Sequence, residues 1–271
     1  MSDRLPRNEI LIDWEDFKLD IGDGTTIALS RAHYANYTST ILMLPGFTSK
    51  RRNSTNVDVA NRLAGFGIQC IVADLSGHGD SSGDIEDQTV LRAAAEIASL
   101  LERLTVNGIT PPGQRIAVLA NSFSANAALL VAAERSDLSA IVLKSPVVDY
   151  FSMRAAQLGD AKMEQWRVNR WIRLNDGTPS KYAFIEDALK ANSYEAIEKV
   201  SCPLLAVHGG EDNDIPKEQI EKFRSRLLKL GQQHVIFIDA DHGISGHNFK
   251  PCMELFVGFL LEHLIRRGDS L

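Results

Sequence analysis

The chain has 271 residues, of which 44% are hydrophobic and 24% are charged, so its composition is that of an ordinary globular protein with a sizeable core. This composition excludes a disordered chain, a collagen-like protein and a coiled coil. The 35 acidic residues outnumber the 29 basic ones, and the net charge of −6 argues against a nucleic-acid partner.

Three features of the sequence bear on the cell compartment of the protein and on its need for a metal. Residues 1–7 are polar and lack the apolar stretch of a secretory signal. No run approaches the roughly 18 apolar residues of a membrane span. Cys70, Cys202 and Cys252 are scattered and lack the spacing of a zinc site or a disulfide framework. We therefore expect a cytoplasmic protein that needs no metal and no other cofactor, and the sequence leaves a homodimer open.

Short apolar runs alternate with longer amphipathic stretches, which is typical of β-α-β units around a parallel sheet. The chain begins with a predicted antiparallel hairpin, whose strands over 17–21 and 25–32 are joined by Gly22-Asp23-Gly24. The other predicted strands are 39–44, 69–73, 115–120, 140–144, 203–207 and 235–238. The predicted helices are 57–65, 89–104, 124–134, 217–230 and 249–265. We expect one α/β domain over residues 1–271, with about eight strands.

The segment 145–201 interrupts this alternation because it is too long for a single crossover between strands. Apolar residues at alternate positions from 166 to 174 lead into Asn175-Asp176-Gly177, which favours a hairpin. Residues 163–171 fit a helix equally well, and short apolar runs cannot decide between the two. Either way, we expect an insertion between two sheet strands that acts as a small lid.

The most informative stretch is residues 116–125, where an apolar strand ends in a small-x-Ser-x-small pentad and opens into an alanine-rich helix. A nucleophile on such a turn has a strained backbone, so the residues two before and two after it must be small. Ala120 and Ser124 meet this requirement around Ser122, and the helix N-terminus would favour a developing negative charge. Ser124 is the weaker candidate because Asn126 flanks it. A simple helix cap is the structural alternative.

Two further strand ends carry matching motifs. The strand 203–207 runs into His208-Gly209-Gly210-Glu211-Asp212-Asn213-Asp214-Ile215-Pro216, and the strand 235–238 runs into Asp239-Ala240-Asp241-His242-Gly243. With the serine pentad, these motifs give the chain order nucleophile, acid, histidine, and the chain resembles the α/β-hydrolase family. The family's H-G-x-x-D-x-x-hydrophobic-P segment matches His208, Gly209, Asp212, Ile215 and Pro216.

The resemblance covers most of the chain and implies an α/β-hydrolase fold with a mostly parallel sheet flanked by helices. It implies Ser122 as nucleophile, Asp212 as acid and His242 as general base. Imidazole can take the serine proton near neutral pH, and a carboxylate on its other nitrogen fixes the tautomer. The backbone N–H groups of Phe123 and Phe47 are the implied oxyanion donors. The family often has His-Gly before the second donor, whereas here Pro45 replaces that histidine.

Other residues compete for these roles. Asp214 lies on the same loop as Asp212 and is the alternative acid, and His247 is the alternative base. The turn over 74–81 matches the family's D-x-x-G-H-G-x-S pattern and is expected to be structural, because it lacks the Lys-Ser/Thr pair of a phosphate loop. Structural roles in the neighbouring loops are also expected for Asp239, Asp241 and His208.

Aromatic and sulfur-containing side chains concentrate in the segment 145–201. They either form a small satellite core over the sheet or wall a pocket over Ser122, and both can hold together. The residues that we expect to contact substrate there are Trp166, Trp171, Tyr150 and Met153.

The resemblance implies a serine hydrolase that cleaves carboxylic esters through an acyl-enzyme, like a carboxylesterase. The short lid is similar to that of bacterial cinnamoyl and feruloyl esterases and of serine aminopeptidase-like hydrolases, which favours small-molecule acyl or aromatic esters. Thioesterases and acyltransferases use the same three residues, so thioesters stay open as substrates. A hydrolase-like scaffold that binds without turnover is the alternative of another class, because the usual glycines of the serine turn are missing.

Overall fold

The computed structural model describes residues 12–32, 37–227 and 233–265. The polar segment 1–7 and the predicted helical residues 228–230 lie outside the described residues. Within the described ranges, none of the helices combines the length and the apolar character that crossing a membrane would require.

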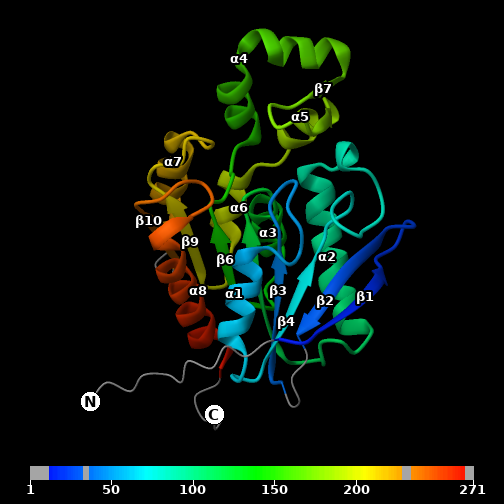
Figure 1. Ribbon diagram of the computed structural model, residues 1–271, viewed down its shortest axis with the longest axis vertical. Coiled ribbons are helices and arrows are strands. Elements are labelled where there is room, and N and C mark those ends of the chain that lie inside the picture. Colours follow the sequence, from blue (N-terminus) through cyan, green and yellow to red (C-terminus); the bar gives the residue numbers. More distant parts are fainter. Residues whose placement is uncertain (1–11, 33–36, 228–232, 266–271) are drawn as a thin grey trace.

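An eight-stranded sheet forms the centre of the molecule, with the strand order β1-β2-β4-β3-β5-β6-β9-β10 (Figure 1). The strands are β1 (Trp14–Asp20), β2 (Thr26–Ala32), β3 (Ser39–Leu44), β4 (Ile68–Ala73), β5 (Arg115–Asn121), β6 (Leu138–Lys144), β9 (Leu204–Gly209) and β10 (Gln233–Ile238). β2 pairs antiparallel with β1 and β4, and all other neighbours pair in parallel. The predicted α/β-hydrolase fold, with its hairpin and mostly parallel sheet, is confirmed.

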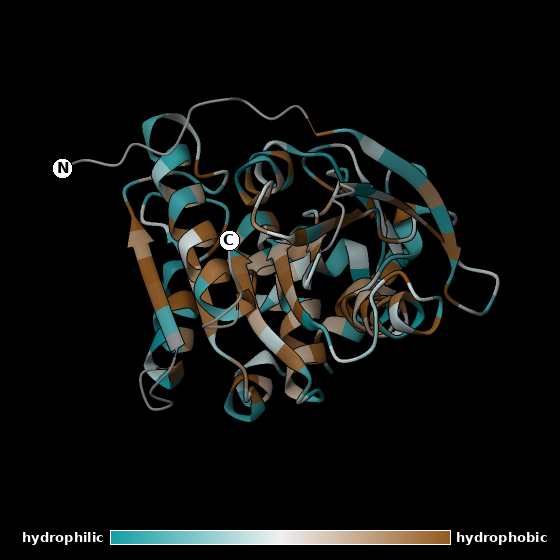
Figure 2. Ribbon diagram, turned by 90° about the horizontal axis from the view of Figure 1, so that it is seen from below, coloured by the Kyte–Doolittle hydropathy of each residue, from teal (hydrophilic) through white to brown (hydrophobic). Residues whose placement is uncertain are grey.

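Helices cover both faces of the sheet and create two cores. One face packs on α1 (Ser54–Leu63) and α8 (Phe249–Leu264), and the other on α2 (Val90–Val106), α3 (Phe123–Ala133), α6 (Ser193–Lys199) and α7 (Lys217–Leu227). Ile41 and Met43 of β3 point into the first core, and Leu42 and Leu44 point into the second. Burial on both faces explains why the inner strands are continuous apolar runs, which are brown in Figure 2.

Side-chain caps fix where several helices begin. Asn53 accepts a hydrogen bond from the N–H of Asn56 at the start of α1, and Thr89 accepts one from Arg92 at the start of α2. These bonds satisfy N–H groups that have no partner inside the helix. Two short 3₁₀ helices, η1 (Ile85–Asp87) and η2 (Gly246–Asn248), complete the loops near the sheet.

The segment between β6 and β9 contains both structures that the sequence left open. α4 (Tyr150–Asn169) is a helix with a kink at Gly159, and β7 (Trp171–Arg173) and β8 (Pro179–Lys181) form a hairpin, followed by α5 (Ala183–Ala188). The apolar alternation from 166 to 174 therefore belongs to two elements, because α4 continues to Asn169. α4, β7 and α5 lie above the carboxyl edge of the sheet, at the top of Figure 1.

Candidate active site

Ser122 lies on the turn between β5 and α3 with φ 50° and ψ −104°. A positive φ is strained for a residue with a side chain, so the surrounding structure must hold it in place. Its N–H donates to the carbonyl of Lys144 on β6 at 2.8 Å. On its other side, a methyl group added to Gly46 would lie 3.3 Å from Ser122 Cβ, so the loop after β3 passes close to the serine.

Ser124 is fully buried and its hydroxyl is committed to the same turn. Its Oγ donates to the carbonyl of Asn121 at 3.1 Å and accepts from the N–H of Asn121 at 3.0 Å. The side-chain amide of Asn121 donates to the carbonyl of Leu44 at 2.6 Å, which ties the end of β5 to the end of β3. Ser124 therefore stabilises the turn and does not face the cavity described below.

Ser122, His242 and Asp212 lie in one continuous hydrogen-bonded chain. His242 Nε2 is 3.0 Å from Ser122 Oγ, and His242 Nδ1 is 2.7 Å from Asp212 Oδ2. The other carboxylate oxygen of Asp212 accepts the N–H groups of Asp214 and Ile215 at 2.8 and 3.1 Å. The Asp212 side chain is 1% exposed and the His242 side chain 27%, so the chain runs from the interior toward solvent.

The environment keeps Asp212 charged and its neighbour His208 neutral. Burial acts to raise the pKa of Asp212, but the hydrogen bond and charge of His242 outweigh it and the pKa is lowered overall. Burial lowers the pKa of His208 to about 4, although Asp212 opposes this shift. His208 Nε2 lies 3.4 Å from Asp212 Oδ2, so a neutral imidazole packs beside the carboxylate, consistent with the structural role expected for it.

Two residues at the end of β6 hold the loop that carries His242. Lys144 Nζ donates to the carbonyl of Gly243 at 2.6 Å, and Ser145 Oγ donates to the carbonyl of His242 at 2.7 Å. Asp241 closes the loop from the other side by accepting the N–H and hydroxyl of Ser245. Lys144 and Ser145 were missed by the sequence reasoning because they belong to no motif and act across the sheet.

The alternative acid and base occupy different positions. Asp214 gives its N–H to Asp212, and its own carboxylate is exposed. His247 is exposed in η2, where its Nε2 lies 3.1 Å from the amide of Asn248. Of the two alternatives, Asp214 alone lines the cavity next to Ser122.

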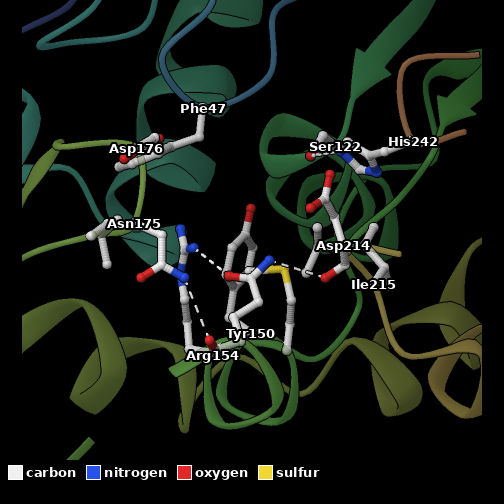
Figure 3. A pocket seen from close by; sticks show the side chains of 13 residues that line it. Phe47, Ser122, Tyr150, Arg154, Asn175, Asp176, Asp214, Ile215 and His242 are labelled. Atoms are coloured by element: carbon white, nitrogen blue, oxygen red, sulfur yellow. Dashed lines mark hydrogen bonds between the residues drawn. The ribbon is translucent and has the colours of Figure 1, made fainter. Parts of the chain in front are cut away.

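Ser122 and His242 open onto a cavity of about 410 Å³ between the sheet edge and the insertion (Figure 3). The lining residues are Phe47, Ser122, Val147, Tyr150, Met153, Arg154, Gln157, Leu174, Asn175, Asp176, Asp214, Ile215 and His242. Of the four substrate-contact residues expected in the lid, Tyr150 and Met153 line this cavity and Trp166 and Trp171 do not. Trp166 is fully buried and donates to the carbonyl of Ser180, and Trp171 is 39% exposed and donates to Glu86.

An aromatic cluster surrounds the two predicted oxyanion donors, Phe47 on the loop after β3 and Phe123 at the start of α3. The Phe47 ring packs edge-on against Phe123 and His78, with centroids 5.3 and 5.8 Å apart. Tyr150 packs edge-on against Phe123 at 5.8 Å. Phe123 is the first residue of α3, so its N–H has no acceptor within the helix. The turn over 74–81 that carries His78 is held by Asp74, whose buried carboxylate accepts the N–H of Arg51 at 2.6 Å.

The sequence reasoning also missed four polar residues of the cavity wall, Arg154, Gln157, Asn175 and Asp176. A usable signal existed, since Tyr150, Met153, Arg154 and Gln157 are three or four residues apart and share one face of α4.

One group of side chains within the described residues has the spacing of a metal site: Asp212, Asp214 and His242. His242 and Asp212 bind each other, and His242 also contacts Ser122, so the same side chains are already engaged in the hydrogen-bonded chain.

A sequence model described as the alpha/beta hydrolase family matches residues 41–254. The chain belongs to the alpha/beta hydrolase family. No curated protein matches this alpha/beta hydrolase by sequence.

Similar solved structures cover nearly all of the alpha/beta hydrolase. Est1E from Butyrivibrio proteoclasticus with bound ferulic acid is 21% identical, with 92% of this chain and 100% of that chain covered and a TM-score of 0.80. Alpha/beta hydrolase domain-containing protein 10 from mouse is 18% identical, with 92% and 99% covered and a TM-score of 0.77. The esterase Pf2001 from Pyrococcus furiosus is 18% identical, with 94% of each chain covered and a TM-score of 0.70. At these identities, the likeness establishes the fold alone.

Proposed function

We propose that this alpha/beta hydrolase is a serine hydrolase that cleaves carboxylic esters through an acyl-enzyme. The observation that carries the proposal is the unbroken hydrogen-bonded chain from Ser122 through His242 to Asp212, which opens onto a cavity large enough for a small ester. The names of two structural neighbours, an esterase and a protein with bound ferulic acid, support an ester among the possible substrates.

In the proposed first step, Ser122 Oγ attacks the ester carbonyl while its proton moves to His242 Nε2. Asp212 accepts the hydrogen bond from Nδ1, keeps the lone pair of Nε2 directed at the serine, and stabilises the imidazolium that forms. The lowered pKa of Asp212 supports this role, because the carboxylate must stay charged at neutral pH.

In the proposed later steps, the N–H groups of Phe47 and Phe123 stabilise the negative oxygen of the tetrahedral intermediate. The C–O bond of the ester breaks, the alcohol takes the proton from His242, and the acyl group remains on Ser122. Water then attacks the acyl-enzyme and gives a proton to His242. The bond between the acyl group and Ser122 Oγ breaks, the carboxylic acid leaves, and Ser122 Oγ takes the proton back from His242.

We also propose that the chain forms one domain, in which the insertion (residues 145–201) acts as a lid over the sheet edge. The position of Tyr150 and Met153 in the cavity wall supports this role. A cytoplasmic location is proposed from the cysteines, since Cys70, Cys202 and Cys252 are all buried and unpaired.

A fluorophosphonate probe tests the proposed nucleophile directly. The probe should label the wild type and fail to label Ser122→Ala, whereas Ser225→Ala, which removes an exposed hydroxyl on α7, should be labelled like the wild type. An unlabelled wild type would contradict the proposal.

A substrate panel tests the bond that is cleaved. p-Nitrophenyl esters from acetate to decanoate, methyl cinnamate and a thioester should give saturable turnover that His242→Ala removes. Faster turnover of the thioester than of the esters would make a thioester the proposed substrate. Absence of turnover with every substrate would favour the non-catalytic scaffold.

A further inference from the structure

Arg154 is a positively charged side chain in the wall of the cavity that contains Ser122. It projects from α4, and Figure 3 shows it on the Asn175 side of the cavity, across from Ser122 and His242. The cavity therefore has the proposed nucleophile, Ser122, on its sheet side and the positive charge of Arg154 on its lid side.

The guanidinium of Arg154 has more donors than acceptors around it. Nη1 donates to Gln157 Oε1 at 2.7 Å, whereas Nε is enclosed by the protein and has no hydrogen-bond partner. Among the described residues, no carboxylate forms an ion pair with Arg154. A guanidinium carries five N–H donors in a fixed plane, and leaving an enclosed donor unpaired is unfavourable.

Gln157 holds the guanidinium in a defined orientation. Its Nε2 donates to the carbonyl of Asp214 at 3.0 Å, so its oxygen is the atom left to face Arg154. Gln157 thereby connects α4 to the loop that follows Asp212. The guanidinium of Arg154 is consequently fixed relative to the sheet edge rather than carried on a loose side chain.

Two carboxylates share the cavity wall with Arg154. Asp176 and Asp214 are both exposed, and Asp176 accepts the N–H of Thr178. Burial lowers the pKa of Arg154, and these two carboxylates and Tyr150 oppose the shift. Arginine nevertheless stays protonated in proteins, so Arg154 places one positive charge in the cavity wall beside these two carboxylates.

From this arrangement we propose that Arg154 binds a carboxylate of the substrate, so that the preferred substrates are esters carrying a second, negatively charged carboxylate group. This inference rests on the proposed esterase function. A carboxylate matches the planar donor pair of a guanidinium and can form two parallel hydrogen bonds with it. Because Arg154 and Ser122 face each other across the cavity, the carboxylate and the ester carbonyl must lie at opposite ends of a short chain or ring.

Matched esters test the charge preference. p-Nitrophenyl hydrogen adipate is compared with p-nitrophenyl methyl adipate, which is neutral, and with p-nitrophenyl 6-aminohexanoate, which is positive. A second pair, 4-acetoxybenzoate and its methyl ester, places the carboxylate on the leaving group. We expect kcat/KM to be roughly tenfold or more higher for the anionic member of at least one pair. Equal rates in both pairs, or a preference for the positive ester, would overturn the inference.

Variants assign the preference to Arg154. Arg154→Gln should lower kcat/KM for the anionic ester at least about tenfold more than for the matched neutral ester, so that the preference is lost, and Arg154→Lys should keep part of it. Arg173→Gln is the matched control, because it removes one positive charge from the insertion outside the cavity wall. A preference that survives in Arg154→Gln would contradict the assignment.

A binding measurement keeps the two proposals distinguishable. In calorimetry, monomethyl adipate, which carries one ester and one carboxylate, should bind to Ser122→Ala more tightly than the neutral dimethyl adipate, and Arg154→Gln in the same background should abolish the difference. Turnover of neutral esters without any charge preference would leave the esterase proposal intact and reject the role of Arg154. Selective binding of monomethyl adipate by a chain that neither turns over esters nor reacts with fluorophosphonate would do the reverse.

Discussion

The edge of the sheet and the insertion above it form opposite walls of one cavity, and they are held in different ways. At the sheet edge, Ser122, Asp212 and His242 are fixed by hydrogen bonds to the backbone of neighbouring strands and loops. The insertion is tied to the body by packing of its apolar side chains, such as Tyr150 on Phe123, and by partly exposed polar pairs, such as Lys181 with Glu86. The first wall can keep reacting atoms in a fixed geometry, and the second supplies most of the side chains that line the cavity.

The largest expected effect is on kcat and distinguishes the neighbouring carboxylates of Asp212 and Asp214. Asp212→Asn should lower kcat by roughly 10³- to 10⁴-fold, because the amide cannot hold His242 in the required tautomer. Asp214→Asn should cost far less, since it changes an exposed wall residue and keeps the N–H that Asp212 accepts. Steady-state kinetics of both variants decides the comparison, and equal losses would mean that Asp214 shares the role of the acid.

A pair of glycines tests the same contrast in stability. A methyl group at Gly79 would lie 2.0 Å from the buried Asp74 carboxylate, so Gly79→Ala should destabilise the protein by about 3 kcal/mol or more. Gly177, in the turn of the insertion, also has a positive φ but meets nothing within 4 Å, so Gly177→Ala should cost about 1 kcal/mol. Urea unfolding of the two variants measures the difference, and similar values would argue against a more rigid sheet edge.

Folding stability should depend on pH through His208. Burial lowers its pKa from 6.5 to about 4, so between these values the unfolded chain binds more protons than the folded one. The free energy of unfolding should therefore fall as the pH decreases through this window, by up to about 3 kcal/mol at 1.36 kcal/mol per pH unit. The lowered pKa of Asp212 acts only below its unfolded value of 3.8.

Unfolding by urea at pH 7, 5.5 and 4.5 measures this dependence. His208→Asn should flatten it, and the exposed His247→Gln provides the matched control, with the slope of the wild type. An unchanged slope in His208→Asn would place the proton uptake at another group.

The smallest effect is expected where the insertion meets η1. Lys181 contacts Glu86 and Asp87 with partly exposed side chains, and such pairs contribute no more than about 1 kcal/mol. Lys181→Met should lower the free energy of unfolding by less than that and leave kcat nearly unchanged. A large loss of kcat would show that the insertion controls the geometry of the sheet edge.

Much of the sheet and its edge could be predicted from the sequence. Apolar runs such as 39–44 are strands because both faces are buried, and the structure places β3 at the same residues. Ser122, Asp212 and His242 were identifiable because each follows a strand directly, and parallel strands bring their carboxyl ends to one edge. The structure places the three within hydrogen-bond distance, and their roles stay a prediction.

The insertion was much less predictable. Trp166 and Trp171 drew attention as aromatic residues, yet one is buried against Ser180 and the other turns toward Glu86. An apolar residue on a short helix can face either a core or a cavity, and its spacing does not distinguish the two. Arg154 was not predicted because no helix was expected over residues 150–162, where α4 begins.

The sequence by itself determined the order of the sheet strands and of the helices outside the insertion, the strained serine turn and the three strand-end motifs, because each depends on residues adjacent in the chain. Only the tertiary structure decided that Lys144 and Ser145 hold the loop of His242 and that Arg154 faces Ser122. These contacts join residues far apart in the chain, and packing between separate elements, which no local pattern encodes, brings them together.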